Sequence, residues 1–93
     1  MLAQLQSISC RAMKVTQFDF SANHNLKQVW ADNNQNLIKV NVKTGNIALL
    51  GTLEVFDCPN LTTICVDDVA AANAKDPTKW KKDTTAHYSD TCN

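Results

Sequence analysis

Residues 60–74 of the chain, NLTTICVDDVAAANA, contain both a strand pattern and the residues that end it. Leu61, Ile64 and Val66 have the spacing of apolar side chains that enter a core from a strand and the turn before it. Neighbouring side chains of a strand point to opposite faces, so Cys65 is expected to point outward. Two acidic residues and an alanine-rich run follow directly. The stretch therefore predicts a short strand that stops and gives way to a helix.

The same apolar spacing recurs along the chain. The triplets are Leu5-Ile8-Cys10, Val15-Phe18-Phe20, Leu26-Val29-Ala31, Leu37-Val40-Val42, Leu53-Phe56-Cys58 and Leu61-Ile64-Val66. They alternate between a series whose third residue is small and a series whose third residue is larger. Since a coil with two different walls needs this alternation, we expect a solenoid with coils of about 21 residues. The second coil is expected to be longer, because of an insertion over Lys43–Thr52.

A coil of about 20–29 residues with the pattern L-x-x-L-x-L has the period of a leucine-rich repeat. Such repeats place an asparagine three residues after the third apolar position, where its amide bonds buried backbone groups. Asn23 and Asn34 stand at that offset. The sequence therefore predicts an α/β or mainly-β solenoid with a parallel sheet. The alternative is a small antiparallel sheet with hairpins at Asn33-Asn34 and Thr44-Gly45-Asn46.

Composition argues against several classes of function. The 93 residues suffice for one domain. Nine basic and nine acidic residues give no net charge, which argues against a protein that binds nucleic acid or an anionic membrane surface. The longest apolar run, residues 47–50, is too short to span a bilayer. The N-terminal residues MLAQLQSISCRAMKV lack the pattern of a secretion signal, and a fragment that has lost its leader is one interpretation of this.

The sequence predicts no catalytic centre. His24 lies in an asparagine-rich turn and His87 lies near the C-terminus, and neither has a nucleophile at a recognisable spacing. The cysteine and histidine spacings do not match a zinc site, and Asp67-Asp68 lacks the spaced oxygen ligands of a calcium loop. We therefore expect a non-catalytic protein that uses no cofactor.

The C-terminal part of the chain resembles a known family. Residues 53–74, LEVFDCPNLTTICVDDVAAANA, and residues 80–92, WKKDTTAHYSDTC, are similar to the last coil and cap of leucine-rich-repeat proteins secreted by Bacteroidetes, especially flavobacteria. The matching features are Val66-Asp67-Asp68, Trp80-Lys81-Lys82-Asp83, Tyr88 and Cys92. Over Leu5–Gly45 the resemblance is looser. It implies a right-handed coil, an extracellular or cell-surface location, and a chain that continues a longer repeat or stacks on another subunit.

This organisation divides the chain into residues 1–66, which form about three coils, and residues 67–93, which form a C-terminal cap. One of the two acidic residues that begin the cap can hold the start of a short helix over Val69–Ala74. Trp80 and Tyr88 are the large side chains in this segment, and we expect them to cover the last coil.

The four cysteines are expected to play two roles. An outward thiol is a liability in an exported protein, and Cys92 ends the segment that must fold back over the last coil. We therefore expect a Cys65–Cys92 disulfide. Cys10 and Cys58 would lie two coils apart in one wall, close to 10 Å from each other and too far for a bond. They are expected to be buried free thiols.

The expected recognition surface is the outer face of the first series of strands. Aligning the triplets places Trp30 between Ser9 and Asp57, and it pairs Lys27 with Glu54 and Arg11 with Asp32 across neighbouring coils. The predicted binding residues are Lys27, Gln28, Trp30, Asp32, Glu54 and Asp57. Large aromatic residues are enriched at binding hot spots, so the sequence predicts contact with a protein or glycan partner.

Two other interpretations remain open at this point. The strand face can be a solvated surface on which Trp30 packs against the stems of its neighbours. The chain can also be a structural subunit of a surface assembly, which docks through the uncapped edge at Leu5–Cys10.

Overall fold

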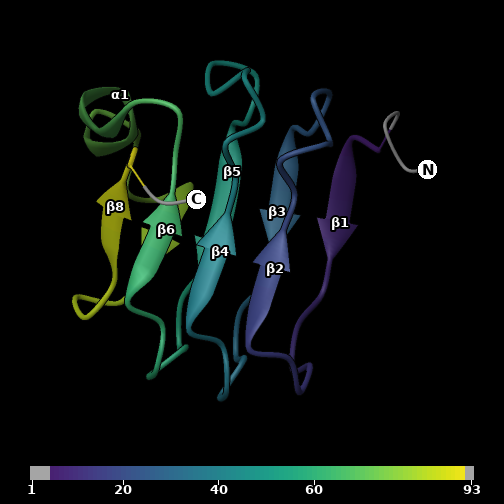
Figure 1. Ribbon diagram of the computed structural model, residues 1–93, viewed down its shortest axis with the longest axis vertical. Helices are drawn as coiled ribbons and strands as arrows, with labels where there is room; N and C mark the ends of the chain where they lie inside the picture. Colours follow the sequence, from purple (N-terminus) through teal and green to yellow (C-terminus); the bar gives the residue numbers. More distant parts are fainter. Residues whose placement is uncertain (1–4, 92–93) are drawn as a thin grey trace.

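The computed structural model describes residues 5–91 and shows a parallel β-solenoid of about three turns (Figure 1). The strands are β1 (Ser7–Ser9), β2 (Gln17–Asp19), β3 (Gln28–Trp30), β4 (Lys39–Asn41), β5 (Thr52–Val55), β6 (Thr63–Cys65), β7 (Trp80–Lys82) and β8 (His87–Ser89). The helix α1 spans Val69–Asn73. The solenoid predicted from the apolar repeat is confirmed.

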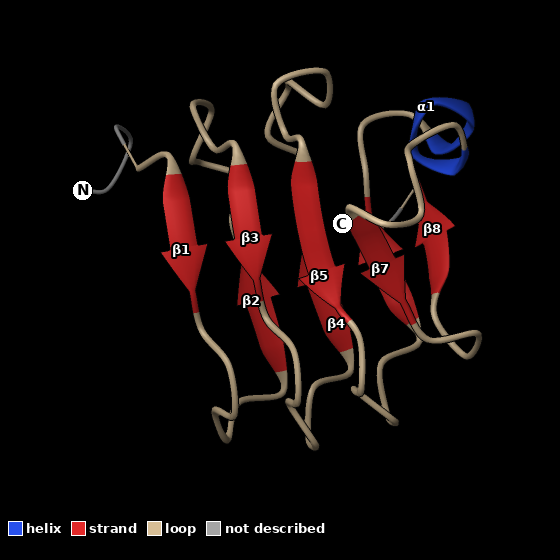
Figure 2. Ribbon diagram, turned by 180° about the vertical axis from the view of Figure 1, so that it is seen from behind, coloured by secondary structure: helices blue, strands red, loops and turns tan. Residues whose placement is uncertain are grey.

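The chain winds between two sheets. Sheet A contains β1, β3, β5 and β7 in that order, and sheet B contains β2, β4, β6 and β8. Figure 1 shows sheet B in front of sheet A, and Figure 2 shows the reverse side, with sheet A in front. Every neighbouring pair of strands is parallel. The alternative of antiparallel hairpins is therefore wrong.

The core fills the space between the two sheets. The register aligns Ile8, Val29, Leu53 and Trp80 in sheet A, and Phe18, Val40, Ile64 and Tyr88 in sheet B. In the second and third coils these side chains are at most 1 % exposed. Burying one such side chain contributes roughly 1.5–3 kcal/mol, so the aligned columns hold successive coils together.

The third coil differs from the predicted triplet by three residues. Leu50, Leu53 and Val55 enter the core, and each is at most 1 % exposed, whereas Phe56 is 53 % exposed. The prediction that Phe56 lies inside is therefore wrong. The stretch Leu50–Cys58 contains the repeat spacing in two registers, and the one that buries Leu50 and Val55 places the phenyl ring on the outside.

The shift also changes the predicted length of the insertion and the residue predicted at the third core position of this coil. Twenty-four positions separate Leu26 from Leu50, against 21 between Leu5 and Leu26, so the extra length is three residues. Val55 takes the third core position of this coil in place of Cys58. The alternation of small and large third residues is therefore less regular than expected.

The segment predicted to be the C-terminal cap holds the expected helix. Asp68 precedes α1 with extended backbone, and its Oδ1 accepts a hydrogen bond of 3.1 Å from the Ala71 N–H. An acid at this position stabilises a helix start because it accepts from free amides. The helix over Val69–Asn73, capped by Asp68, agrees with the prediction.

The same segment also adds one strand to each sheet, β7 to sheet A and β8 to sheet B. Trp80 is 4 % exposed, and its ring meets Tyr88 edge-on at 5.9 Å between centroids. In the register of sheet A, Lys82 of β7 stands beside the core residue Val55 of β5. A charged residue ends the apolar column there, and α1 contacts β8, so we call this end of the solenoid the closed end.

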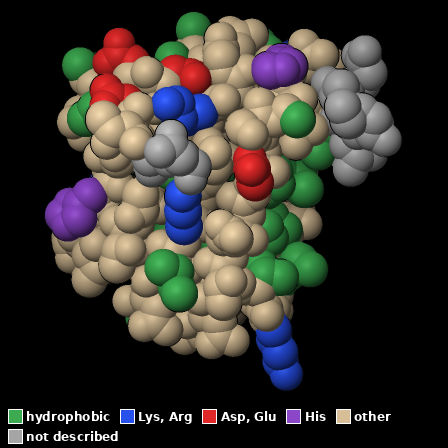
Figure 3. All heavy atoms as spheres, viewed as in Figure 1, with side chains coloured by type: hydrophobic (Ala, Val, Ile, Leu, Met, Phe, Trp, Pro, Cys, Tyr) green, Lys and Arg blue, Asp and Glu red, His purple; other side chains and the backbone are tan. Residues whose placement is uncertain are grey.

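The opposite end, which we call the open end, has no helix beside it within residues 5–91. Its terminal strands are β1 and β2, and Leu5, Ile8 and Phe18 are only partly buried there. Figure 3 shows hydrophobic side chains gathered along this end, at the right of the view. The Phe18 ring stacks on Phe20 at 5.6 Å between centroids, which covers part of the apolar surface.

The cysteines agree with the prediction where the structure describes them. Cys10 and Cys58 are buried free thiols, as expected. Cys58, however, follows the strand in a turn and does not share the wall column of Cys10. Cys65 shares an outward column with Asn41 and Ser89, yet it is fully buried. Cys92 lies outside the described residues, so the Cys65–Cys92 disulfide stays a prediction.

Candidate interaction surface

The outer face of sheet A presents two columns of side chains. The register aligns Ser9, Trp30, Glu54 and Lys81 in one column, and Ser7, Gln28 and Thr52 in the other. These residues point outward because they alternate with the core residues Ile8, Val29 and Leu53. Trp30 therefore stands inside the face, with a neighbour in its column on either side.

Trp30 is held in place by groups from the first coil. The Arg11 guanidinium carbon lies 6.0 Å from the centre of the Trp30 ring, within the range of a cation–π contact. The Arg11 Nε also lies 3.3 Å from the Asp32 Oδ2. Trp30 is consequently partly covered, which fixes the position of the indole and leaves part of it exposed. The predicted pairing of Arg11 with Asp32 across two coils is confirmed.

Two of the predicted binding residues do not join this face as expected. Lys27 lies beside Gly51, whose N–H donates to the Lys27 carbonyl at 2.9 Å, and Glu54 lies beside Trp30. The predicted pairing of Lys27 with Glu54 is therefore wrong. Asp57 lies in the turn after β5 with φ of 60°, so it does not share the column of Trp30. Both errors follow from the three-residue shift in the third coil.

The remaining predicted residues do come together. Gln28 and Trp30 lie on β3, Glu54 lies on β5, and Asp32 follows β3 directly. The Ser7 hydroxyl donates to the Gln28 Oε1 at 2.8 Å, which links the first two coils on this face. The sheet therefore collects an aromatic ring, an amide and two carboxylates on one surface.

Lys81 and Thr52 also lie on this face, and neither was predicted from the sequence. Lys81 was missed because its segment was assigned to a cap, although it stands beside Glu54 in the register. The only sign of a fourth strand in the sequence was the apolar residue Trp80. The residues around it depart strongly from the repeat, because Pro77 stands three positions before it and the charged Lys82 stands two positions after it. Thr52 was missed because of the shift in the third coil.

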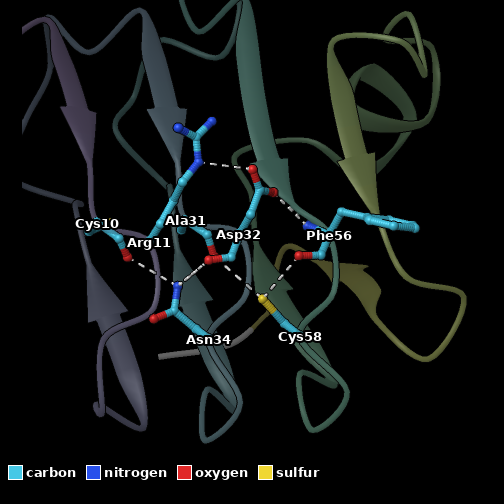
Figure 4. A network of polar contacts seen from close by, with 7 residues as sticks. All are labelled: Cys10, Arg11, Ala31, Asp32, Asn34, Phe56 and Cys58. Atoms are coloured by element: carbon cyan, nitrogen blue, oxygen red, sulfur yellow. Dashed lines mark hydrogen bonds and ion pairs between the residues drawn. The ribbon is translucent and has the colours of Figure 1, made fainter.

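The turns below the surface are tied together by polar side chains (Figure 4). The fully buried Asn34 donates from Nδ2 to the carbonyl oxygens of Cys10 at 3.1 Å and Ala31 at 2.6 Å. Its Oδ1 accepts from the Met13 N–H at 2.7 Å. The asparagine predicted to bond buried backbone groups is thus confirmed at Asn34. Asn23 occupies the equivalent turn of sheet B, where its carbonyl accepts from the Leu26 N–H at 3.2 Å.

Asp32 joins three successive coils at the rim of the surface. Its Oδ2 pairs with Arg11 of the first coil, and its Oδ1 accepts from the Phe56 N–H of the third coil at 3.1 Å. Asp83 lies in the same rim column two coils later, and its oxygens accept from the Asp57 N–H at 3.1 Å and the Cys58 N–H at 2.7 Å of the third coil. Asp32 and Asp83 therefore link neighbouring coils at the rim of sheet A.

Burial keeps the Cys10 and Cys58 thiols protonated, which lowers their reactivity as nucleophiles. Burial raises the pKa of Cys10 to about 11, and the charge of Cys58 acts in the same direction. Burial likewise raises the pKa of Cys58. Both groups are therefore thiols at neutral pH, and nucleophilic chemistry requires the thiolate.

Two features are absent from the described part of the chain. Within residues 5–91, no group of three His, Cys, Asp or Glu side chains could hold a metal ion. No helix in the same residues is long and apolar enough to cross a membrane. The His24 Nδ1 lies 2.5 Å from the Thr44 carbonyl oxygen, so this nitrogen is occupied by the backbone.

Comparison with known proteins adds no identification to this geometry. No protein-family model matches the chain, and searches of curated proteins and of solved structures find no match either.

Proposed function

We propose that the chain is a non-catalytic extracellular leucine-rich-repeat module that contacts a protein or glycan partner through the outer face of sheet A. The observation that carries the proposal is Trp30, an indole held at the centre of a flat face by Arg11 and flanked by Glu54. Tryptophan and arginine are enriched among the residues that dominate binding energy. The indole is already fixed by its neighbours, so little conformational entropy of this side chain is lost when a partner binds.

The polar groups around Trp30 suit a protein or a glycan. Gln28 and Thr52 offer hydrogen bonds, while Asp32, Glu54 and Lys81 supply charges of both signs. A partner that covers the indole can satisfy these groups at the rim, as in protein interfaces. The proposed location outside the cell, and the proposed Cys65–Cys92 disulfide, rest on the family resemblance of the sequence.

A binding screen tests the proposal. The protein is probed against arrays of glycans and of extracellular proteins, and each partner found is titrated with the Trp30→Ala variant. His87→Ala, an exposed ring on sheet B, is the matched control. We expect Trp30→Ala to weaken binding by about thirtyfold or more, the loss typical of a hot spot, and His87→Ala to change little. Equal affinities for the two variants would refute the proposal.

The open end supports a second candidate, a structural subunit that docks through β1 and β2. In the second coil Val29 and Val40 are fully buried, whereas their counterparts Ile8 and Phe18 are only partly buried. An unpaired edge beside an apolar core is a surface for strand addition. Light scattering tests this candidate. Association that Phe18→Asp abolishes and Trp30→Ala preserves would favour docking at the open end over the sheet face.

A further inference from the structure

A pocket lies at the closed end of the solenoid, and Trp30 is not among its lining residues. Its volume is about 640 Å³, within the range of about 300–1,000 Å³ of small-molecule sites. It lies among α1, the segment that follows α1, and strands β7 and β8. The lining residues that matter for its chemistry are Phe56, Lys75, Trp80, Lys81, Lys82 and Tyr88.

The charge of this pocket is of one sign. Three lysines line it, and no Asp or Glu is among the lining residues. Several acids stand next to lining residues. Asp83 accepts hydrogen bonds from the Asp57 and Cys58 amides, Asp76 accepts from the Thr78 N–H and hydroxyl, and Glu54 lies beside Lys81 in sheet A. Because the whole chain carries no net charge, a pocket whose charged lining residues are all lysines departs from the average of the surface. An anion is the complementary ligand.

Two of the three ammonium groups are held by their surroundings. The Lys75 Nζ donates to the Ile47 carbonyl at 2.9 Å and to the Leu50 carbonyl at 3.4 Å, and it lies 5.3 Å from the centre of the Trp80 ring. The Lys82 Nζ lies 5.4 Å from the centre of the Tyr88 ring. A ligand therefore meets positive charge whose position is already fixed, which lowers the entropic cost of binding.

The same pocket offers an apolar wall. Phe56 is 53 % exposed and occupies the rim position that is Asp32 in the coil before and Asp83 in the coil after. Figure 4 shows its ring pointing away from the rim network, toward the C-terminal strands. Together with the partly buried Tyr88, Phe56 supplies aromatic surface that an apolar group can cover.

We infer that this pocket binds a small organic anion with an apolar body, such as an arylacetate. The carboxylate would lie near Lys82, because Lys81 belongs to the outward column of sheet A beside Glu54, and the apolar body would pack against Phe56 and Tyr88. The site is separate from Trp30, so the inference does not depend on the proposed function of sheet A.

The two tryptophans give a direct test. In a ¹⁵N-labelled sample each indole N–H gives one resonance, and the Trp80 indole reports on the pocket because its Nε1 donates to the Leu50 carbonyl at 2.9 Å. The probes are phenylacetate, phenethylammonium, which has the opposite charge, and acetate, which lacks the apolar body. We expect only phenylacetate to shift the Trp80 resonance in a saturable way, while the Trp30 resonance stays in place.

Lys82→Met keeps the aliphatic stem and removes the charge, and Lys14→Met, at the other end of the chain, is the matched control. We expect Lys82→Met to weaken phenylacetate binding about fivefold and Lys14→Met to leave it unchanged. An equal response to phenethylammonium would show an apolar groove without charge selection and would overturn the inference. So would the absence of any Trp80 shift, or equal binding by the two lysine variants.

Discussion

Asn34 and Cys58 occupy the same turn position in successive coils, and both donate a hydrogen bond to the carbonyl oxygen of Ala31. The Asn34 amide does so at 2.6 Å within its own coil, and the Cys58 thiol does so at 3.4 Å from the next coil. Leucine-rich repeats accept either asparagine or cysteine at this position. The reason is visible here, since both side chains can donate to a buried carbonyl in a space closed to water.

Asn34→Ala is expected to destabilise the protein by about 2–4 kcal/mol. The change leaves the Met13 N–H and the Cys10 and Ala31 carbonyls with fewer partners in a buried turn, and unsatisfied buried polar groups cost about 1–3 kcal/mol each. Urea unfolding followed by circular dichroism measures the loss. Asn36→Ala, an exposed position in the next turn, is the control and should change the free energy of unfolding little.

Asp68→Ala is expected to cost about 1 kcal/mol, because α1 then loses the carboxylate that accepts from the Ala71 N–H. The same unfolding measurement checks this value. Asp68→Asn retains an acceptor oxygen and should recover most of the loss. If both substitutions were without effect, Asp68 would not stabilise the helix start.

The fold could be predicted from the sequence where the repeat has one reading. Leu26, Val29 and Ala31 have no competing triplet nearby, and they occupy the core as predicted. In the third coil, Leu50 and Leu53 both begin an acceptable triplet. The choice between them depends on pairing with strands 24 or more positions away, and local spacing does not contain that information.

The interaction surface follows the same division. The pairing of Arg11 with Asp32 depends on the first two coils, whose offset of 21 residues is unambiguous, and the structure confirms it. The pairing of Lys27 with Glu54 depends on the third coil, and it is wrong by the same three residues. The position of Lys81 could not be predicted from the repeat. Its strand has the apolar Trp80 at the position of Leu53, but it has Lys82 where the coil before has the core residue Val55.

High pH is expected to destabilise the protein through Cys10. Its pKa in the folded protein, about 11, lies above the unfolded value of 9.0, so the folded state favours the protonated thiol. This contribution is complete below pH 9 and is lost as the pH rises toward 11. Cys58 and Tyr88 have pKa values raised by burial and act in the same direction.

The pH effect can be assigned to Cys10 by comparing unfolding free energies at pH 8 and pH 10.5. The protein should lose stability over this interval, and Cys10→Ala should lose less than the wild type. If the two proteins lost equal stability, deprotonation of Cys10 would not oppose folding.

The last prediction concerns Cys65, which is fully buried although it lies in the outward column of sheet B. Its neighbours in that column, Asn41 and Ser89, are only partly buried, so Cys65 is covered from outside the sheet. We expect this cover to include a disulfide to Cys92, which lies outside the described residues.

Such a bond closes a loop of about 28 residues and would stabilise the fold by about 3 kcal/mol. Alkylation of the unreduced, unfolded protein followed by peptide mapping should label two thiols, Cys10 and Cys58, and should recover Cys65 and Cys92 in one linked peptide. Reduction should lower the urea midpoint, and Cys65→Ala should produce the same decrease without reductant. Labelling of all four cysteines would contradict the prediction. A bond between Cys10 and Cys58 would also contradict the placement of these two residues in the first and third coils of the solenoid.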